Sequence, residues 1–205
     1  MIKYFVLILT VVCLSDQRTL IIDSLSTKDD ILNKLTDLNK VPDFTLKSHD
    51  GKEYSMRSLE GKVVLLNFWA TWCYPCRLEI PELNEFHEEY EDLIVLGLSI
   101  SDTKKQLEDF SKLYDVKYPL LYGTSKEIDK ISMDYGGIFA VPTSILIDRN
   151  GEKVFSYPGA VLKQNDQWDG VYSTLLKKIT ESLGVEKSSK KEWFLDNFIY
   201  FYYLF

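Results

Sequence analysis

Cysteine is scarce in this chain, with three residues in 205, and three cysteines cannot supply the several bridges of a disulfide scaffold. Histidine is scarcer, with two residues, so few side chains of the kind that zinc prefers are present. Positive charge is also in deficit, because the net charge is −7 and a nucleic-acid-binding face needs clustered Lys and Arg. We therefore expect no disulfide scaffold, no metal or other cofactor, and no nucleic-acid partner.

No apolar run in the sequence reaches the roughly twenty residues of a membrane-spanning helix. The run at residues 4–14 follows one positive charge and precedes polar residues, which is the order of a secretory signal peptide. We therefore predict export to the periplasm or to the outer face of a membrane. Residues 1–15 would be the signal peptide, or a lipoprotein leader that ends at a lipidated Cys13. Residues 16–40 would form a linker or helix.

The carboxyl terminus carries a second unusual segment. Residues 185–205 consist of a short charged linker and an aromatic tail, and the tail at 193–205 has eleven apolar or aromatic residues in thirteen. Aromatic residues beside lysines suit a membrane interface, so association with a membrane surface is one expectation. Folding back over an apolar surface, or pairing with a second chain, fits the same composition equally well.

Residues 41–184 have the pattern of one mixed α/β domain. Hydrophobic residues make up 45% of the chain and charged residues 27%, as in ordinary globular proteins. Strands are predicted at 44–46 and 53–54, which form a hairpin, and at 63–69, 93–100, 119–122, 143–147 and 153–157. Helices are predicted at 73–90, with a kink at Pro81, and at 103–114, 127–135 and 166–183. Strands that alternate with helices indicate an α/β sandwich.

Two of the cysteines, Cys73 and Cys76, stand three positions apart at the start of a predicted helix. Residues i and i+3 of a helix lie about 5 Å apart at Cα, which is inside the range that a disulfide tolerates. The first turn of a helix also points free N–H groups at the Cys73 sulfur and favours its thiolate. Cys73 is therefore the expected nucleophile and Cys76 the expected resolving thiol. Pro75 fits a first turn because it needs no hydrogen-bond donor there.

Two other uses of the cysteine pair are open at this point. A zinc site would need four ligands, and His49 and His87 stand at spacings that fit no common zinc finger. A permanently closed structural disulfide is the stronger alternative, although so short a loop constrains the unfolded chain very little.

A longer stretch around the pair, residues 67–79 with Pro81 after it, resembles the active-site segment of thioredoxin-like proteins. Val141-Pro142-Thr143 resembles the cis-proline loop of that family. The resemblance covers residues 41–183. The early hairpin, an insertion at 102–135 and the leader are similar to the exported TlpA/ResA group of thiol-disulfide oxidoreductases. The implied fold is a thioredoxin-like sandwich with an N-terminal β-hairpin and a central insertion.

The resemblance also implies roles for residues around the pair. Pro142 should be cis and lie beside the cysteines, where the backbone of Val141 pairs with a bound substrate strand. The expected substrate-binding residues are Trp72, Tyr74, Pro75, Val141 and Pro142. Phe139 either lines the same groove or packs in the core.

Two departures from cytoplasmic thioredoxin concern proton transfer. The buried Asp of that family aligns with Asn67, and its partner Lys aligns near Gly97, so the usual proton route is missing. Glu79 matches the helix glutamate of the ResA-like group, and we interpret it as the group that exchanges protons with Cys76. The alternative is that Glu79 is simply a solvated helix carboxylate.

The function implied is an exported enzyme that reduces disulfides in other exported proteins. Apocytochrome c is one implied substrate class, and a membrane thiol reductase would restore the dithiol. Thr143 stands where the cytochrome-maturation subgroup has Glu, so the pathway stays open. A peroxiredoxin-type peroxidase is disfavoured because Leu66 and Ala70 replace the Pro and Thr of its pattern. A binding module of thioredoxin fold with idle cysteines is the remaining alternative.

Overall fold

The computed structural model describes residues 40–185. The expected leader (1–15), nearly all of the expected linker (16–40) and the aromatic tail (193–205) lie outside the described residues, so the interpretations given to them stay predictions. None of the helices within residues 40–185 combines the length and the apolar character that crossing a membrane requires.

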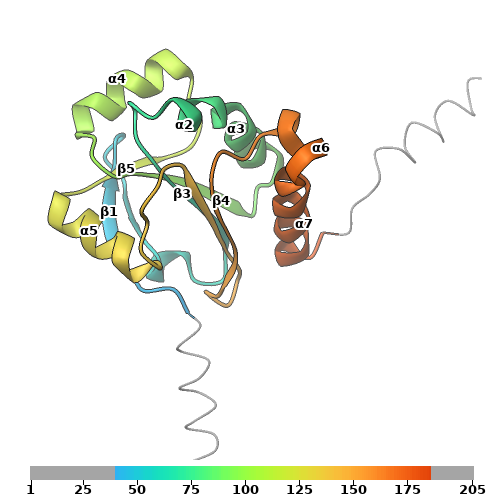
Figure 1. The fold of residues 1–205 in the computed structure, drawn as a ribbon. Helices are drawn as coiled ribbons and strands as arrows, with labels where there is room; N and C mark the ends of the chain where they lie inside the picture. Colours follow the sequence, from blue (N-terminus) through green and yellow to red (C-terminus); the bar gives the residue numbers. More distant parts are fainter. Residues whose placement is uncertain (1–39, 186–205) are drawn as a thin grey trace, which may run out of the picture. The chain divides into compact units, whose positions relative to one another are not determined.

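A seven-stranded mixed sheet forms the centre of the described region (Figure 1). The strand order across the sheet is β2-β1-β5-β4-β3-β6-β7. The strands are β1 Thr45–Ser48, β2 Glu53–Ser55, β3 Val63–Trp69, β4 Leu93–Ser99, β5 Leu120–Tyr122, β6 Thr143–Ile147 and β7 Lys153–Pro158. Strands β5, β4 and β3 run parallel, whereas the β1–β2 and β6–β7 hairpins flank them with antiparallel pairing.

Helices cover both faces of this sheet. They are η1 Arg57–Leu59, α2 Tyr74–Leu78, α3 Ile80–Glu89, α4 Lys104–Tyr114, α5 Ser125–Asp134, η2 Lys163–Asn165, α6 Asp166–Asp169 and α7 Val171–Leu183. The apolar side chains of α3, α4 and α7 enter one core cluster, and those of α5 enter a second. Figure 1 shows α5 in yellow and α7 in red-orange on opposite sides of the sheet.

Strand β3 is buried along its whole length and lies at the heart of both clusters. The apolar run predicts a strand over residues 63–69, and β3 has the same bounds. Leu65 packs in the cluster under α3 and Leu66 in the cluster under α5, because successive strand side chains point to opposite faces. The predicted hairpin over β1 and β2 and the α/β class are confirmed as well.

Two predicted helices are each divided in two. The expected kink at Pro81 was wrong in position, because the break between α2 and α3 falls earlier, at Glu79. Pro81 instead occupies the first turn of α3. Residues of a first turn donate no intrahelical hydrogen bond, so the missing N–H of proline costs nothing there. The last helix, predicted at 166–183, is interrupted by Gly170. The φ of Gly170 is 62°, in the left-handed region that glycine adopts without steric cost.

Helix α4, which matches the helix predicted at 103–114, buries a narrow apolar face. Leu107 and Phe110 of α4 are buried, but Leu113 is 77% exposed. Only the positions that contact the sheet are therefore covered.

Candidate active site

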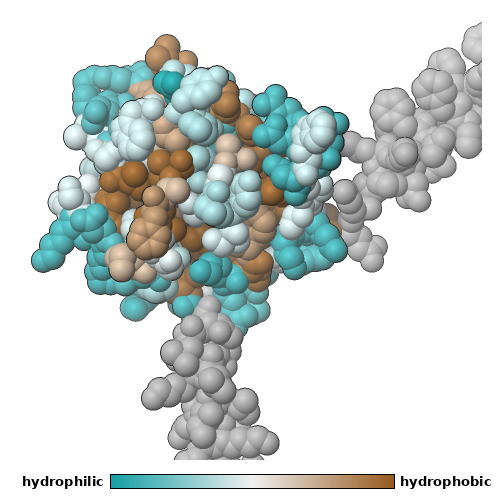
Figure 2. All heavy atoms as spheres, in the orientation of Figure 1, coloured by the Kyte–Doolittle hydropathy of each residue, from teal (hydrophilic) through white to brown (hydrophobic). Residues whose placement is uncertain are grey.

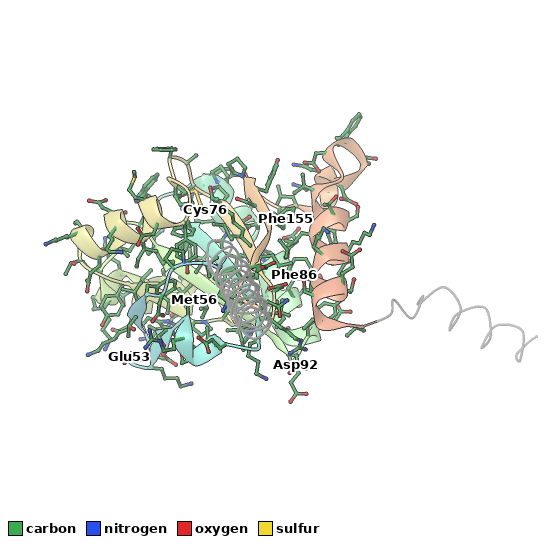
Figure 3. All side chains as sticks on the ribbon, turned by 90° about the horizontal axis from the view of Figure 1, so that it is seen from below. Glu53, Met56, Cys76, Phe86, Asp92 and Phe155 are labelled. Atoms are coloured by element: carbon green, nitrogen blue, oxygen red, sulfur yellow. A yellow bond between two sulfur atoms is a disulfide. The ribbon has the colours of Figure 1, made fainter. Side chains whose placement is uncertain are left out.

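The turn after β3 brings Cys73 to the amino end of α2. Cys73 is the N-cap residue with an extended backbone, and the amide of Cys76 donates a hydrogen bond to Cys73 Sγ at 3.2 Å. The two sulfurs form a disulfide, with Cα atoms 5.3 Å apart, as the i, i+3 spacing predicted. Figure 3 draws these sulfur atoms in yellow beside the label of Cys76.

This geometry makes the two sulfurs chemically unequal. Amide groups at the start of α2 point toward Cys73 Sγ, and a negative sulfur is stabilised there. The neighbouring side chains Trp72 and Tyr74 are 64% and 62% exposed, so Cys73 lies beside accessible surface. Both cysteines are buried, with 4% of Cys73 and 2% of Cys76 exposed, but Cys76 sits inside the helical turn whereas Cys73 is its N-cap. The arrangement suits a nucleophile at Cys73 and a resolving thiol at Cys76.

The peptide bond between Val141 and Pro142 is cis, as predicted. It precedes β6, and the Val141 carbonyl oxygen lies 3.6 Å from Cys73 Sγ. The amide of Gly159, which follows β7, donates to the Pro142 oxygen at 2.9 Å and holds the loop in place. The Val141 amide donates to none of the described groups. It is therefore free to meet an extended substrate segment.

Glu79 follows Cys76 by three positions in the sequence, and its side chain is fully buried. Its carboxylate accepts hydrogen bonds from Asn67 Nδ2 at 2.8 Å and from the Val161 amide at 2.9 Å. Burial raises the pKa of Glu79 from 4.5 to about 8, and the two hydrogen bonds oppose this while the Glu82 charge adds to it. The alternative of a solvated helix carboxylate is wrong, because Glu79 reaches no solvent.

The structure shows why β4 carries no side chain opposite Asn67. Asn67 of β3 pairs directly with Gly97 of β4, and Gly97 has no room for a side chain. A Cβ atom on Gly97 would lie 2.9 Å from Leu120 Cδ2 and 3.0 Å from both Trp69 Nε1 and Tyr118 Cε2. Leu120 and the two aromatic rings therefore fill the space that a lysine would need, and Glu79 is a buried titratable group three positions after Cys76.

Exposed aromatic side chains border the cysteines. Besides Trp72 and Tyr74, Phe139 is 89% exposed, so packing of Phe139 in the core is excluded. The Arg77 guanidinium lies 5.5 Å from the centre of the Tyr74 ring. Figure 2 shows hydrophobic surface, coloured brown, on the face that carries the segment between α5 and β6. Pro75 is exposed as well.

Some residues of this site carry no local sequence signal. Ser144 on β6 accepts a hydrogen bond from Asn67 Nδ2 at 3.1 Å, and Val161 holds Glu79 through its backbone. Asp102 and Ser101, at the start of the insertion, contact the residues before Cys73. Their only sequence signal is position, just after the strand predicted at 93–100, which the structure pairs with β3.

Comparison with known proteins gives the family. Residues 38–154, more than half of the chain, match the AhpC/TSA family. The chain belongs to this family. Among its relatives, the thiol-disulfide oxidoreductase ResA of Bacillus thuringiensis subsp. konkukian is 33% identical over 143 residues, which are 69% of this chain and 77% of ResA. The predicted relationship to ResA is thus confirmed.

Solved structures place this AhpC/TSA chain in the thioredoxin fold. A thiol:disulfide interchange protein of the thioredoxin family from Chlorobium tepidum TLS is similar with a TM-score of 0.57 at 29% identity, over 66% of this chain and 94% of that protein. The exposed lipoprotein thioredoxin of Streptococcus pneumoniae strain TIGR4 is similar with a TM-score of 0.53 at 29% identity, over 64% and 99%. With its Cys73–Cys76 pair, the protein is a thiol-disulfide oxidoreductase.

Proposed function

We propose that this oxidoreductase reduces disulfides in other exported proteins, with Cys73 as the attacking thiol. The observation that carries the proposal is the position of Cys73 Sγ. It accepts the Cys76 amide at the start of α2 and lies 3.6 Å from the Val141 oxygen beside cis-Pro142. A thiolate is favoured at that point, and a substrate strand has a free backbone to pair with.

The reaction runs through one mixed disulfide. The Cys73 thiolate attacks one sulfur of the substrate disulfide, and the other substrate sulfur leaves as a thiolate that takes a proton from solvent. The Cys76 thiol then gives its proton to the Glu79 carboxylate and attacks Cys73 Sγ. The second substrate sulfur leaves as a thiolate and is protonated in turn. The substrate has gained two electrons, and the enzyme holds the Cys73–Cys76 disulfide.

Glu79 fits the proton step in both directions. Its pKa of about 8 in the disulfide form keeps the carboxyl protonated at neutral pH. When a reductant opens the disulfide, this proton is available for the Cys76 sulfur, and the carboxylate that remains is ready for the next cycle. Trp72, Tyr74 and Pro75 supply exposed surface for substrate docking.

The proposed setting is outside the cytoplasm. The order of charge and apolar residues in 1–15 and the similarity to an exposed lipoprotein thioredoxin support export. A membrane thiol reductase would return the enzyme to its dithiol form, and apocytochrome c is one substrate class that the relationship to ResA suggests. The aromatic tail at 193–205 would then contact the membrane surface.

A trapping experiment tests the proposal. Cys76→Ser should accumulate covalent adducts with insulin, a protein with accessible disulfides, and dithiothreitol should release them. The matched control Cys73→Ser should form none, because its remaining thiol at Cys76 lies inside the helical turn and lacks the N-cap position and the amide donor that Cys73 Sγ has. Equal trapping by both variants, or none by either, would contradict the assignment of Cys73.

Two other outcomes would favour the alternative functions. Wild-type protein that stays oxidised in excess dithiothreitol would indicate a structural disulfide and a binding module. Consumption of hydrogen peroxide with dithiothreitol as the reductant would indicate a peroxidase. We expect neither, and we expect insulin reduction instead.

A further inference from the structure

The residues before Cys73 form a tight turn at the end of β3. The Cys73 amide donates to the Ala70 oxygen at 3.1 Å, so Thr71 and Trp72 occupy the two central positions. This turn converts the direction of the strand into that of α2 and sets where Cys73 Sγ lies. Whatever holds Thr71 and Trp72 therefore helps to position the nucleophile.

Asp102 holds the first of these two residues. Asp102 follows β4 and is 94% buried, with 6% of its surface exposed. Its Oδ2 accepts from the Thr71 amide at 2.8 Å, and its Oδ1 accepts from Thr71 Oγ1 at 2.6 Å. Ser99 Oγ donates to Asp102 Oδ2 at 2.7 Å, and it accepts from the Asp102 amide at 2.9 Å. The buried carboxylate thus has three donors, two of them from one residue of the turn.

Ser101, the residue next to Asp102, contacts Trp72, the second central residue of the turn. Trp72 Nε1 donates to Ser101 Oγ at 3.0 Å. One step earlier, the Ile100 amide donates to the Trp69 oxygen at 2.9 Å, so the two chain segments stay paired beyond the ends of β3 and β4. The segment 100–102 therefore contacts the last residue of β3 and both central residues of the turn, while the solvent-facing side of the Trp72 indole stays available.

We propose that Asp102 is a positioning residue that sets the reactivity of the Cys73–Cys76 pair by fixing the Thr71–Cys73 turn. Asp102 touches neither sulfur, and it acts through Thr71. A fixed turn keeps Cys73 Sγ within bonding reach of Cys76, so it raises the effective concentration of one sulfur toward the other. A loose turn lowers that concentration and makes the disulfide less favourable relative to the dithiol.

The equilibrium of the full-length protein with the glutathione couple measures this effect. Asp102→Asn keeps the size of the side chain but replaces one carboxylate oxygen by an NH₂ group. The two donors of Thr71 would then have one acceptor oxygen instead of two. We expect the equilibrium to shift about tenfold toward the dithiol, which corresponds to about 30 mV for this two-electron couple. A change in folding stability alone would not move this ratio, because it affects both redox forms alike.

Variants of Thr71 separate the positioning of the turn from the effect of the Asp102 charge. Removal of that charge also makes a nearby thiolate easier to form, which shifts the equilibrium toward the dithiol as well. Thr71→Val keeps the charge and the shape but loses the Oγ1 donor, and it should shift the equilibrium several-fold the same way. Thr71→Ser keeps the donor and should behave like the wild type. The control Asp109→Asn, an exposed carboxylate on α4 paired with Lys105, should have no effect.

Three results would overturn the proposal. An unchanged glutathione equilibrium in Asp102→Asn, with a lowered melting temperature, would show a purely structural role. A shift in Asp102→Asn without any shift in Thr71→Val would show a charge effect. If Asp102→Asn does not fold, the Thr71 pair decides alone, and equal equilibria for Thr71→Val and Thr71→Ser would reject positioning.

Discussion

Glu79 shows how a single side chain acquires its chemistry from burial. An exposed glutamate on a helix is ionised at neutral pH, whereas this one is fully buried three positions after Cys76. Among residues 40–185, its donors are Asn67 Nδ2 and the Val161 amide. Two neutral donors do not replace a full hydration shell, so the protonated form is favoured. The nearby Tyr118 hydroxyl has a raised pKa for the same reason, burial, with the Glu79 charge adding to it.

The pH dependence of stability tests this state of Glu79. Between pH 4.5 and about 8 the folded protein keeps a proton that the unfolded chain has lost. The contribution is complete below pH 4.5 and falls by up to about 1.4 kcal/mol per pH unit until it is lost above about 8. Glu79→Gln cannot titrate, so its free energy of unfolding should fall less between pH 5 and 8 than that of the wild type.

Urea unfolding of the oxidised proteins measures the difference. At pH 5 the Gln variant should be the less stable by about 1 kcal/mol, because its amide nitrogen cannot accept one of the two hydrogen bonds. That deficit should shrink or reverse by pH 8. Glu88→Gln, an exposed change on the same helix, is the control and should keep the wild-type slope. Identical slopes for Glu79→Gln and the wild type would contradict a raised pKa.

At the scale of the elements, the sequence predicts well where one physical signal dominates. The continuous apolar run predicts both ends of β3 correctly, and the Cys73–Cys76 spacing predicts where α2 begins. The sequence does not predict the division of the long helix at Glu79. A proline is expected to mark the break, but Pro81 lies in the first turn of α3, where a helix tolerates proline. The partners of Glu79 lie 12 and 82 positions away. No local pattern reveals contacts at such distances, so burial of Glu79 could be known only from the assembled sheet.

Strand β4 offers a test of the packing that replaces a lysine. Gly97→Ala would place a Cβ atom against Leu120, Trp69 and Tyr118 at 2.9–3.0 Å, closer than side chains normally approach. We expect a loss of about 1–3 kcal/mol in the free energy of unfolding, measured by urea denaturation. Ser156→Ala on the exposed side of β7 is the control and should change stability by less than about 0.5 kcal/mol. A neutral or stabilising effect of Gly97→Ala would show that the side chains around Gly97 can move to accommodate a methyl group.

At the scale of the whole molecule, most of the packing lies outside the disulfide. Cys73 and Cys76 belong to one of the two core clusters, close to the end of β3, and the other members of the two clusters line both faces of the sheet. An enzyme that opens and closes its bond in each cycle needs a body that stays folded in both states.

Reduction of the protein tests whether the fold depends on the disulfide. A loop closed over three positions of sequence removes little entropy from the unfolded chain, and the chain-entropy relation gives roughly 2 kcal/mol. We expect the dithiol form to keep the far-ultraviolet circular dichroism of the oxidised form and to melt about 5 °C lower. The Cys73→Ser, Cys76→Ser double variant should behave like the reduced protein. Unfolding on reduction at 25 °C would contradict this view of the core.

The buried carboxyl has a consequence for how electrons and protons travel together. If Glu79 gives its proton to the Cys76 sulfur, reduction of the disulfide below pH 8 draws from solvent at most the one proton that Cys73 takes, rather than two. At a pH where Cys73 is protonated in the dithiol form, the midpoint potential would then change by about 30 mV per pH unit, half of the value for a simple dithiol. Such a protein keeps a steadier reducing power when the acidity of its surroundings varies.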